Sequence, residues 1–458
     1  MTAVIKGKNT KDFWNDIFPY MIISLGAILC FCAYFLVSPI KVLEENSFAN
    51  IFCILLVCLF LLVLCSLFFT RFLKIKSFVI FGAVLAIGAA ALAMRLYFLD
   101  SASGDYNSFL SVWLEEMRSL SGVEAIVKPI GDYNMPYLYL LFGFSRSSVY
   151  DLYLIKLLSI VFDFVLAFGI SKLVYRFSNS EFSAVLGFAA PLFVPTVFLN
   201  SAMWAQCDSI YAAFCVWALY FALSNKPKTS VVFFGLAFSF KMQSIFIFPI
   251  IIFLVLKNKI KLSQLIYFPV TFIATLIPAI LCGRSIYDTF SIYINQTNSY
   301  PNLTLNCPTF WAFFPEESFN IFGTAALFLA GAVVLCFCAY LYYNKAKLNS
   351  ALLLDAAYLF TLLLPFFLPR MHERYFYLAE VLSVVYMLLH KKRAFMPPLL
   401  LFTAFDCYCA YLFGYRCFNL WELSIINAVV IFYLFYKFIG DVQSAKTNFL
   451  PERSEGKI

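Results

Sequence analysis

Charged residues are scarce in this chain. Lysine, arginine, aspartate and glutamate make up 13% of its 458 residues, about half of the share found in ordinary soluble domains. A soluble globule needs polar residues to cover its surface and a disordered chain needs them to stay solvated, so this composition excludes both classes. The chain also lacks a basic domain interleaved with aromatic residues, so no nucleic-acid partner is expected.

Histidine is nearly absent, and the cysteines lack the spacing of a metal site. The chain has 2 histidines and 14 cysteines. Most cysteines lie inside apolar runs, several of them as pairs two residues apart, such as Cys336 and Cys338. Residues two apart on a helix point to different faces, which makes them poor chelators. We therefore interpret the cysteines as small buried side chains and expect no zinc site.

Apolar sequence fills the chain instead. Hydrophobic residues make up 63% of it, in blocks of about 20, the length that crosses a hydrocarbon core of roughly 30 Å. The sequence predicts an all-α, polytopic integral membrane protein with about 12–14 helical crossings, as one domain over 1–440 with a disordered cytoplasmic tail over 441–458. The predicted spans are 18–37, 48–69, 78–98, 150–173, 182–199, 209–223, 265–282, 321–342, 351–368, 375–389, 395–413 and 421–438.

Clusters of lysine and arginine orient these spans, because positive charge is enriched in cytoplasmic loops. Both termini are therefore predicted on the cytoplasmic side. The segment 231–256 is basic at both ends and carries Lys241 near its middle. Two short helical arms, 231–240 and 244–256, that meet at a break near Lys241 satisfy the charge rule. The clusters assigned to the cytoplasm are 6–11, 71–76, 172–176, 226–228, 257–261, 345–347 and 391–393.

With this topology, the outer side of the membrane receives nearly all the unusual polar residues. Two long loops, 99–149 and 283–320, and three short connections, 204–208, 241–243 and 369–374, face this side. Polar residues are costly at membrane depth, and those that occur there are usually functional. The five segments are therefore the places where candidate site residues gather.

Asp105 is the first candidate catalytic residue. It precedes an amphipathic stretch, 108–120, that is predicted to lie on the membrane surface as an interfacial helix. A carboxylate at that boundary can take a proton from an acceptor hydroxyl, or it simply caps the helix that follows. Asp132 is a second candidate from the same loop, but Asn134 and Pro136 beside it favour a structural role in a turn.

Four further candidates lie in the short connections. Gln206 and Asp208 belong to a segment with hardly any loop, where an unpaired carboxylate is costly, although Asp208 could also cap a helix. Lys241, with Gln243 beside it, interrupts an apolar stretch. An ammonium group at this depth needs an anion, which is either a bound phosphate or a protein carboxylate, Asp163 or Asp355.

A cationic cluster completes the set. Arg370, His372 and Arg374 offer N–H donors suited to a phosphate group, and Glu373 could orient one of them. A topology signal is the alternative, but it fits poorly because the cluster lies on the side where positive charge is disfavoured. Arg95 lies at the outer end of the third span. It could join the same anion site, or its side chain could extend so that the guanidinium group reaches the membrane–water interface.

Together these residues predict a site where an anionic, membrane-embedded substrate reacts next to a base. A sugar carried on a polyprenyl phosphate fits this description. The lipid would lie between helices, the phosphate would meet the cations, and the sugar would project outward.

Four segments resemble motifs of the GT-C superfamily of polytopic glycosyltransferases, which use lipid-phosphate-linked sugars. They are similar above all to a bacterial membrane family related to the second mannosyltransferase of GPI-anchor assembly, and to the dolichyl-phosphate-glucose-dependent glucosyltransferases. Segment 204–208 is similar to a Gly-Gln-x-Asp pattern, except that Ala205 replaces the usual glycine. The resemblance covers 95–377. The other three segments are Gly-Asp-Tyr at 104–106, the stretch 235–243 with its late lysine, and Met-His-Glu-Arg at 371–374.

The resemblance implies an inverting transfer of a hexose, mannose or glucose, to a hydroxyl on a glycan, lipid or protein acceptor. Asp105 is then the base. The residues implied to bind the donor phosphate are Lys241, Arg370, His372, Arg374 and Arg95, and those implied to bind or orient substrate are Gln206, Asp208, Glu373, Gln243 and Asp132. A metal-independent reaction is favoured, although a divalent ion is not excluded.

The resemblance also implies a bacterial plasma membrane with the site on its outer face. A transporter or flippase for a lipid-linked sugar or another anionic substrate is the alternative function, because a broken helix and intramembrane aspartates suit it. A membrane polysaccharide polymerase is a third possibility, for which the outer loops hold few basic residues.

Overall fold

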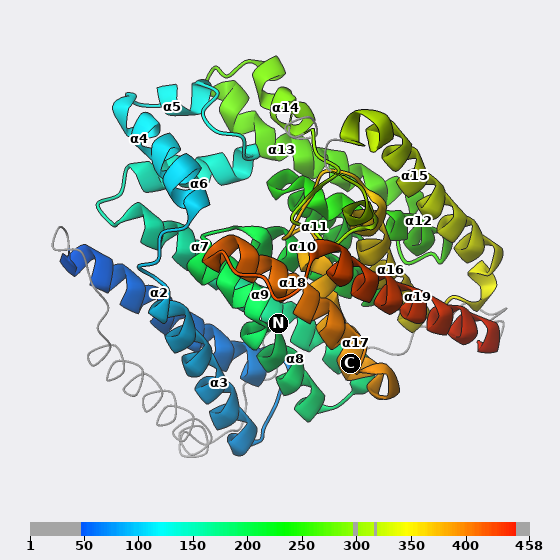
Figure 1. Cartoon of the computed structure of the whole chain (residues 1–458). Helices are drawn as coiled ribbons and strands as arrows, with labels where there is room; N and C mark the ends of the chain where they lie inside the picture. The colour runs from blue at the N-terminus through cyan, green and yellow to red at the C-terminus, as the bar shows by residue number, and fades with distance from the viewer. Residues whose placement is uncertain (1–46, 296–300, 316–317, 446–458) are drawn as a thin grey trace.

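The computed structural model describes residues 47–295, 301–315 and 318–445 (Figure 1). In this part of the chain seven helices are long and apolar enough to cross a membrane, and a bent pair of helices gives an eighth candidate. The chain is therefore an all-α, multi-pass integral membrane protein. The predicted first span, 18–37, and the tail from 446 lie outside the described residues.

The long helices match predicted spans closely. Their positions agree with the predicted boundaries to within several residues, and α19 continues to Ser444, past the predicted start of the disordered tail. They are α2 (Ser47–Leu67) with its extension η1 (Phe68–Phe72), α3 (Phe78–Tyr97), α7 (Asp151–Ser178), η5 (Leu262–Ile266) with α13 (Tyr267–Leu281), α15 (Phe319–Tyr343), α16 (Ser350–Phe367) and α19 (Leu420–Ser444).

The described residues contain fewer full-length membrane-spanning helices than the 12–14 crossings predicted from the sequence. Several predicted crossings are shorter helices, because their outer ends unwind into polar connections. These helices are α10 (Asp208–Leu223), α11 (Pro227–Phe240), α12 (Pro249–Leu256), α17 (Tyr377–Leu389) and α18 (Pro397–Phe413). The connections into which they unwind hold most of the candidate site residues.

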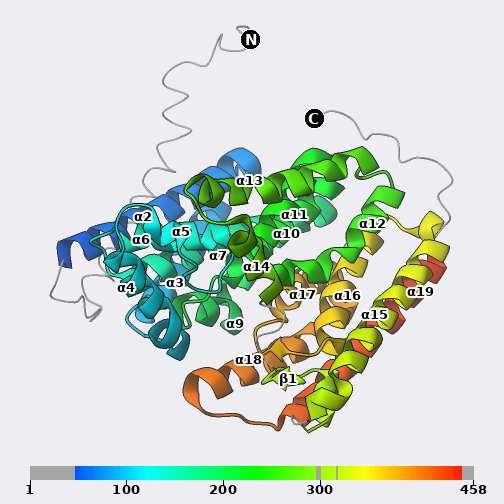
Figure 2. The ribbon, with the colours of Figure 1, turned by 90° about the horizontal axis from the view of Figure 1, so that it is seen from above.

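The remaining elements are short and lie mostly on the side predicted as outer. Figures 1 and 2 show α4, α5 and α6 grouped at one side of the molecule and α15 with α19 at the other. The elements are η2 (Tyr106–Leu110), α4 (Ser111–Ser119), α5 (Glu124–Val127), α6 (Met135–Ser145), α14 (Ile286–Asn295), β1 (Thr304–Leu305), η6 (Phe310–Phe313), η8 (Lys345–Lys347), β2 (Met371–His372) and η9 (Lys391–Arg393).

The predicted span 182–199 is a bent pair of helices rather than one straight helix. Helix α8 (Glu181–Phe193) ends before Val194, and the chain turns by 56° into α9 (Pro195–Phe198) and η3 (Leu199–Met203). Pro195 explains the break, because a residue before proline is forced out of the helical region. Val194 accordingly has an extended backbone, with φ −65° and ψ 123°.

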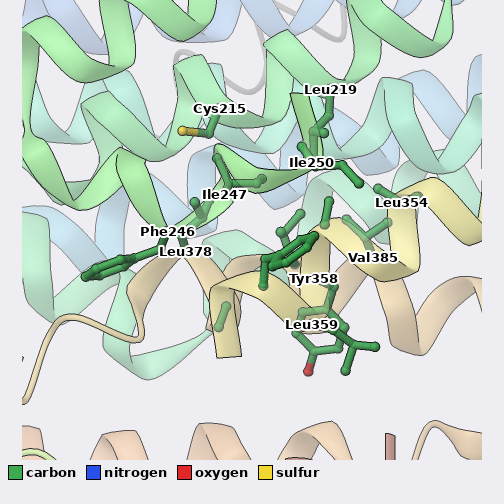
Figure 3. Close-up of a cluster of buried hydrophobic side chains, with 14 of the residues drawn as sticks. Cys215, Leu219, Phe246, Ile247, Ile250, Leu354, Tyr358, Leu359, Leu378 and Val385 are labelled. Carbon is green, nitrogen blue, oxygen red and sulfur yellow. The ribbon is translucent and has the colours of Figure 1, made fainter. Parts of the chain in front are cut away.

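The predicted break at Lys241 is confirmed. Helix α11 ends at Phe240, Lys241 is extended, and a 3₁₀ segment η4 (Met242–Ile247) leads into α12. Gly235 lets α11 approach α13 closely, because a Cβ atom at this position would lie 2.9 Å from the Thr271 Cβ. Buried hydrophobic side chains of the broken segment, from η4 and α12, pack against side chains of α10, α16 and α17 (Figure 3).

The helix after Asp105 packs on the protein through part of its predicted apolar face. Its apolar side chains Leu110, Leu114 and Met117 are buried against α6 and α7. Phe109 and Val112 remain exposed. The apolar face is therefore used to fix the helix, and with it Asp105, onto the protein.

Arg95 is not part of the anion site, which corrects the sequence prediction. Its side chain is fully buried, and Nε donates to the Asp163 carboxylate on α7 at 2.7 Å. Its NH1 donates to the Leu192 carbonyl of α8 at 3.0 Å, and the Ser201 hydroxyl donates to Asp163 at 2.6 Å. Arg95 therefore joins α3, α7, α8 and η3 inside the bundle, because a charge at this depth is stabilised by a partner rather than by water.

We expect Arg95→Leu to lower stability by about 3–5 kcal/mol, because it leaves the Asp163 charge buried without a counter-ion. The double variant Arg95→Leu/Asp163→Leu should recover most of the loss. Thermal unfolding in detergent measures both, with Arg71→Leu at an exposed site as the control. A double variant no more stable than the single variant would contradict this account.

The predicted orientation is tested by labelling single cysteines in intact cells. Ser121 lies exposed between α4 and α5, and Asn225 lies exposed between α10 and α11, which the charge rule places on opposite sides. In a Cys417→Ser background we expect an impermeant maleimide to modify Ser121→Cys directly and Asn225→Cys only after lysis. The reverse pattern would invert the topology.

Candidate functional site

A cavity of about 1020 Å³ opens where the predicted outer segments meet. It receives side chains from both long outer loops and from all three short connections, as well as Tyr411 from the end of α18. The convergence of these segments was the main expectation from the sequence. The lining residues are Asp105, Phe109, Leu110, Trp113, 132–134, Gln206, 240–243, Ile245, Phe246, 304–306, Phe319, Asn320, Gly323, Thr324, Leu327, 368–375 and Tyr411.

Two short strands bring the second outer loop to this cavity. β1 pairs in parallel with β2, with Thr304 opposite Met371 and Leu305 opposite His372. The Arg370 N–H also donates to the Leu303 carbonyl at 3.0 Å. The pairing fixes the main chain of the 369–374 connection, so that its polar side chains line the cavity.

Asp105 is held by side chains from three distant parts of the chain. Its Oδ2 accepts from Trp204 Nε1 at 2.9 Å and from Gln206 Nε2 at 2.6 Å, and Arg374 NH1 lies 3.5 Å away. Its Oδ1 accepts from the Tyr411 hydroxyl. Asp105 makes no capping hydrogen bond to the helix that follows it. The helix-cap alternative is therefore wrong.

The 204–208 connection presents the donors to Asp105 through a tight turn. Ala205 is fully buried and has φ +63°, a left-handed conformation that glycine adopts without strain. Ala205, which stands where the family pattern has glycine, therefore does not prevent the turn. The Trp204 ring stacks on Tyr411 at 4.1 Å between centroids, and the Ser103 hydroxyl donates to the Trp204 carbonyl at 2.7 Å.

Lys241 finds its anion in Asp208, not in Asp163 or Asp355. Its Nζ lies 2.6 Å from Asp208 Oδ1, and Asn200 Nδ2 donates to Oδ2 at 2.9 Å. Asp208 is fully buried beneath the cavity lining, whereas Lys241 lines the cavity. Asp208 thus orients other site residues and is not placed to contact a substrate.

Arg374 joins the two parts of the site. Its guanidinium lies 3.5 Å from Asp105, 3.8 Å from Asp208 and 3.9 Å from Glu373, and it stacks over the Trp204 ring at 5.4 Å. A single guanidinium among three carboxylates fixes their relative positions. Its side chain is 16% exposed, so part of it still faces the cavity.

His372 is not a cation in this site. Burial, with Arg374 and Lys241 nearby, lowers the pKa of His372 to about 3. The imidazole is therefore neutral near pH 7 and offers one N–H donor and one acceptor. The positive charge predicted for the cluster comes from the arginines and from Lys241.

The other predicted residues line the same cavity. Burial raises the pKa of Glu373 to about 7, against the opposing effect of Arg374, and burial also raises the pKa of Asp132. The Arg370 guanidinium lies over the Phe319 ring of α15 at 4.7 Å. Gln243 lines the cavity from η4.

Sequence reasoning missed three contributors. Tyr411 and the indole N–H of Trp204 hold Asp105, and the Tyr133 hydroxyl donates to Gln206 Oε1 at 2.9 Å. Trp204 and Tyr133 lie close in sequence to the predicted residues Gln206 and Asp132. Tyr411 lies near the end of the apolar span 395–413, and no local pattern marks it.

No group of three or more histidine, cysteine, aspartate or glutamate side chains suited to a metal ion occurs among the residues that the structure describes. Metal independence remains a prediction. We expect a chelator to leave any activity of this site intact.

Glu373→Gln should change how stability depends on pH. A carboxyl whose pKa is raised in the folded state contributes stability that is complete below about pH 4.5 and is lost as the pH rises through about 7. The variant should therefore gain up to about 3 kcal/mol over the wild type between pH 5 and pH 8. His372 titrates in both proteins, so its effect cancels.

Melting temperatures of the two proteins at pH 5, 6, 7 and 8 measure this difference. Glu115→Gln, at an exposed position on α4, is the matched control and should follow the wild type at each pH. If the difference in melting temperature between Glu373→Gln and the wild type is the same at every pH, Glu373 does not titrate in this range.

The chain matches no protein-family model, and it matches no curated protein. The functional interpretation therefore depends on the geometry of the cavity, together with the four motif-like segments that line or support it.

Proposed function

We propose that this protein is a glycosyltransferase that moves a hexose, mannose or glucose, from a polyprenyl-phosphate sugar to a hydroxyl acceptor. The proposed setting is the outer face of a bacterial plasma membrane. The observation that carries the proposal is the fixed Asp105 carboxylate, which shares one cavity with Lys241, Arg370 and Arg374. A base beside several cations suits a reaction in which a proton is removed and a phosphate leaves.

Asp105 is the proposed general base. A carboxylate has about four lone-pair sites, and Oδ2 takes the hydrogen bonds of Trp204 and Gln206 while Oδ1 takes that of Tyr411. Oδ1 is therefore the oxygen with the larger remaining capacity for a substrate proton. The donors keep the carboxylate in one orientation, which a positioned base requires.

The reaction is a single displacement. The acceptor oxygen forms a bond to the anomeric carbon, and the bond between that carbon and the phosphate oxygen breaks. The electron pair of the broken bond stays on the phosphate, and the acceptor proton goes to Asp105. Lys241, Arg370 and Arg374 would stabilise the second negative charge on the polyprenyl phosphate, and neutral His372 would donate a hydrogen bond.

The cavity wall on the α15 side suits a lipid-linked donor. Here Arg370 lies beside apolar residues of α15 and η4, and Ile245 and Leu327 are 46% and 55% exposed. Exposed apolar side chains next to a cationic group match a lipid chain attached to a phosphate. A free nucleotide sugar would leave this apolar surface unused.

Purified wild type and Asp105→Asn should be compared on a panel of polyprenyl-phosphate sugars in detergent. We expect wild type to turn over one donor, and Asp105→Asn to lose roughly 10²–10⁴-fold in rate with donor binding retained. Glu115→Gln, a carboxylate on the same loop that does not line the cavity, is the matched control.

Two outcomes would overturn the proposal. Equal turnover by wild type and Asp105→Asn would remove Asp105 as the base. If wild type turns over no donor but moves labelled lipid across a vesicle membrane, the alternative of a transporter or flippase holds, for which the break at Lys241 would be a moving part.

A further inference from the structure

The two sides of the cavity have different chemistry. The α15 side offers Arg370 and apolar side chains, whereas a second wall comes from η2, α4 and the loop before α6. This second wall, here called the α4 wall, consists of Phe109, Trp113, Asp132, Tyr133 and Asn134. It presents aromatic rings and a carboxylate, and it has no lysine or arginine of its own.

Trp113 is held rigidly in the α4 wall. The main chain of Gly131 packs against the indole, since a Cβ atom at Gly131 would lie 2.9 Å from two of its ring carbons. Gly131 also has φ +72°, so glycine is favoured there for both reasons. Tyr133 meets the indole edge-on at 5.8 Å between centroids, and Phe109 lies 6.0 Å away. Trp113 also lines the cavity.

The α4 wall is connected directly to the proposed base. The Tyr133 hydroxyl donates to Gln206 Oε1, and Gln206 Nε2 donates to Asp105 Oδ2. The Tyr133 ring also lies 5.9 Å from Lys241 Nζ. A molecule on this wall is thus next to Asp105, on the side of the cavity away from Arg370 and the exposed apolar residues of α15.

An uncharged sugar ring matches the chemistry of this wall. Its C–H face packs on an aromatic ring, and its hydroxyl groups donate to a carboxylate. An anionic group is disfavoured on this wall, because the wall carries Asp132, lies next to Asp105 and has no lysine or arginine of its own. The volume of about 1020 Å³ is at the upper end of the range for a single small ligand, roughly 300–1,000 Å³.

We infer that the α4 wall is the acceptor subsite and that the acceptor ends in an uncharged sugar ring stacked on Trp113. This inference rests on the proposed glycosyl transfer and adds the class of acceptor. A serine or threonine peptide and an anionic phospholipid are the competing acceptors.

In the test, wild-type protein and its sugar donor are incubated with one of three candidate acceptors: n-octyl hexosides, a Ser/Thr peptide or phosphatidylglycerol. Transfer to each probe and hydrolysis of the donor are measured separately. We expect transfer to the hexosides only. In Trp113→Ala the KM for the hexoside should rise at least about tenfold, while the donor KM and the rate of donor hydrolysis stay unchanged.

Trp113→Phe should fall between wild type and Trp113→Ala, which separates loss of the ring from a folding defect. Val112→Ala, on the same helix but outside the cavity lining, should behave as wild type. Preferred transfer to the peptide or the phospholipid would overturn the inference, as would a change in donor KM alone. Absence of any donor turnover by wild type would instead refute the proposed function.

Discussion

The buried ion pair between Lys241 and Asp208 connects the two places where the helical bundle is interrupted around the site. Lys241 follows the end of α11, and Asp208 follows the left-handed turn that precedes α10. Each charge alone would be costly at this depth, and removing one partner of such a pair typically costs about 3–5 kcal/mol. The broken segment and the tight turn therefore stabilise each other, and the shape of the cavity follows from their contact.

Arg374 extends this pair to the rest of the cavity. It lies between Asp208 and Asp105, so the position of the candidate base depends on charges beneath the lining as well as on its own hydrogen bonds. The site is thus a continuous polar cluster inside an apolar bundle. Such a cluster is rigid when each member has a partner, which suits a reaction that needs a fixed base.

The sequence predicted this arrangement where a charge or a spacing constrained the chain. The basic ends of 231–256 required the break at Lys241, and Pro195 could have indicated the break at Val194, which apolar length alone concealed. The charge of Arg95 did not reveal its role, because an arginine at the end of a helix can pair with a residue inside the bundle as readily as it can face the membrane interface. Tyr411 reaches Asp105 from 306 residues along the chain, and no local pattern encodes such a contact.

The order of the chain has a consequence for biogenesis. The other side chains that hold Asp105 all precede α18, which contributes Tyr411. Membrane helices are made from the N-terminus onward, so the carboxylate gains this partner only when α18 has been inserted. A partly made chain that lacks α18 can therefore hold the other partners of Asp105 without the complete set of donors.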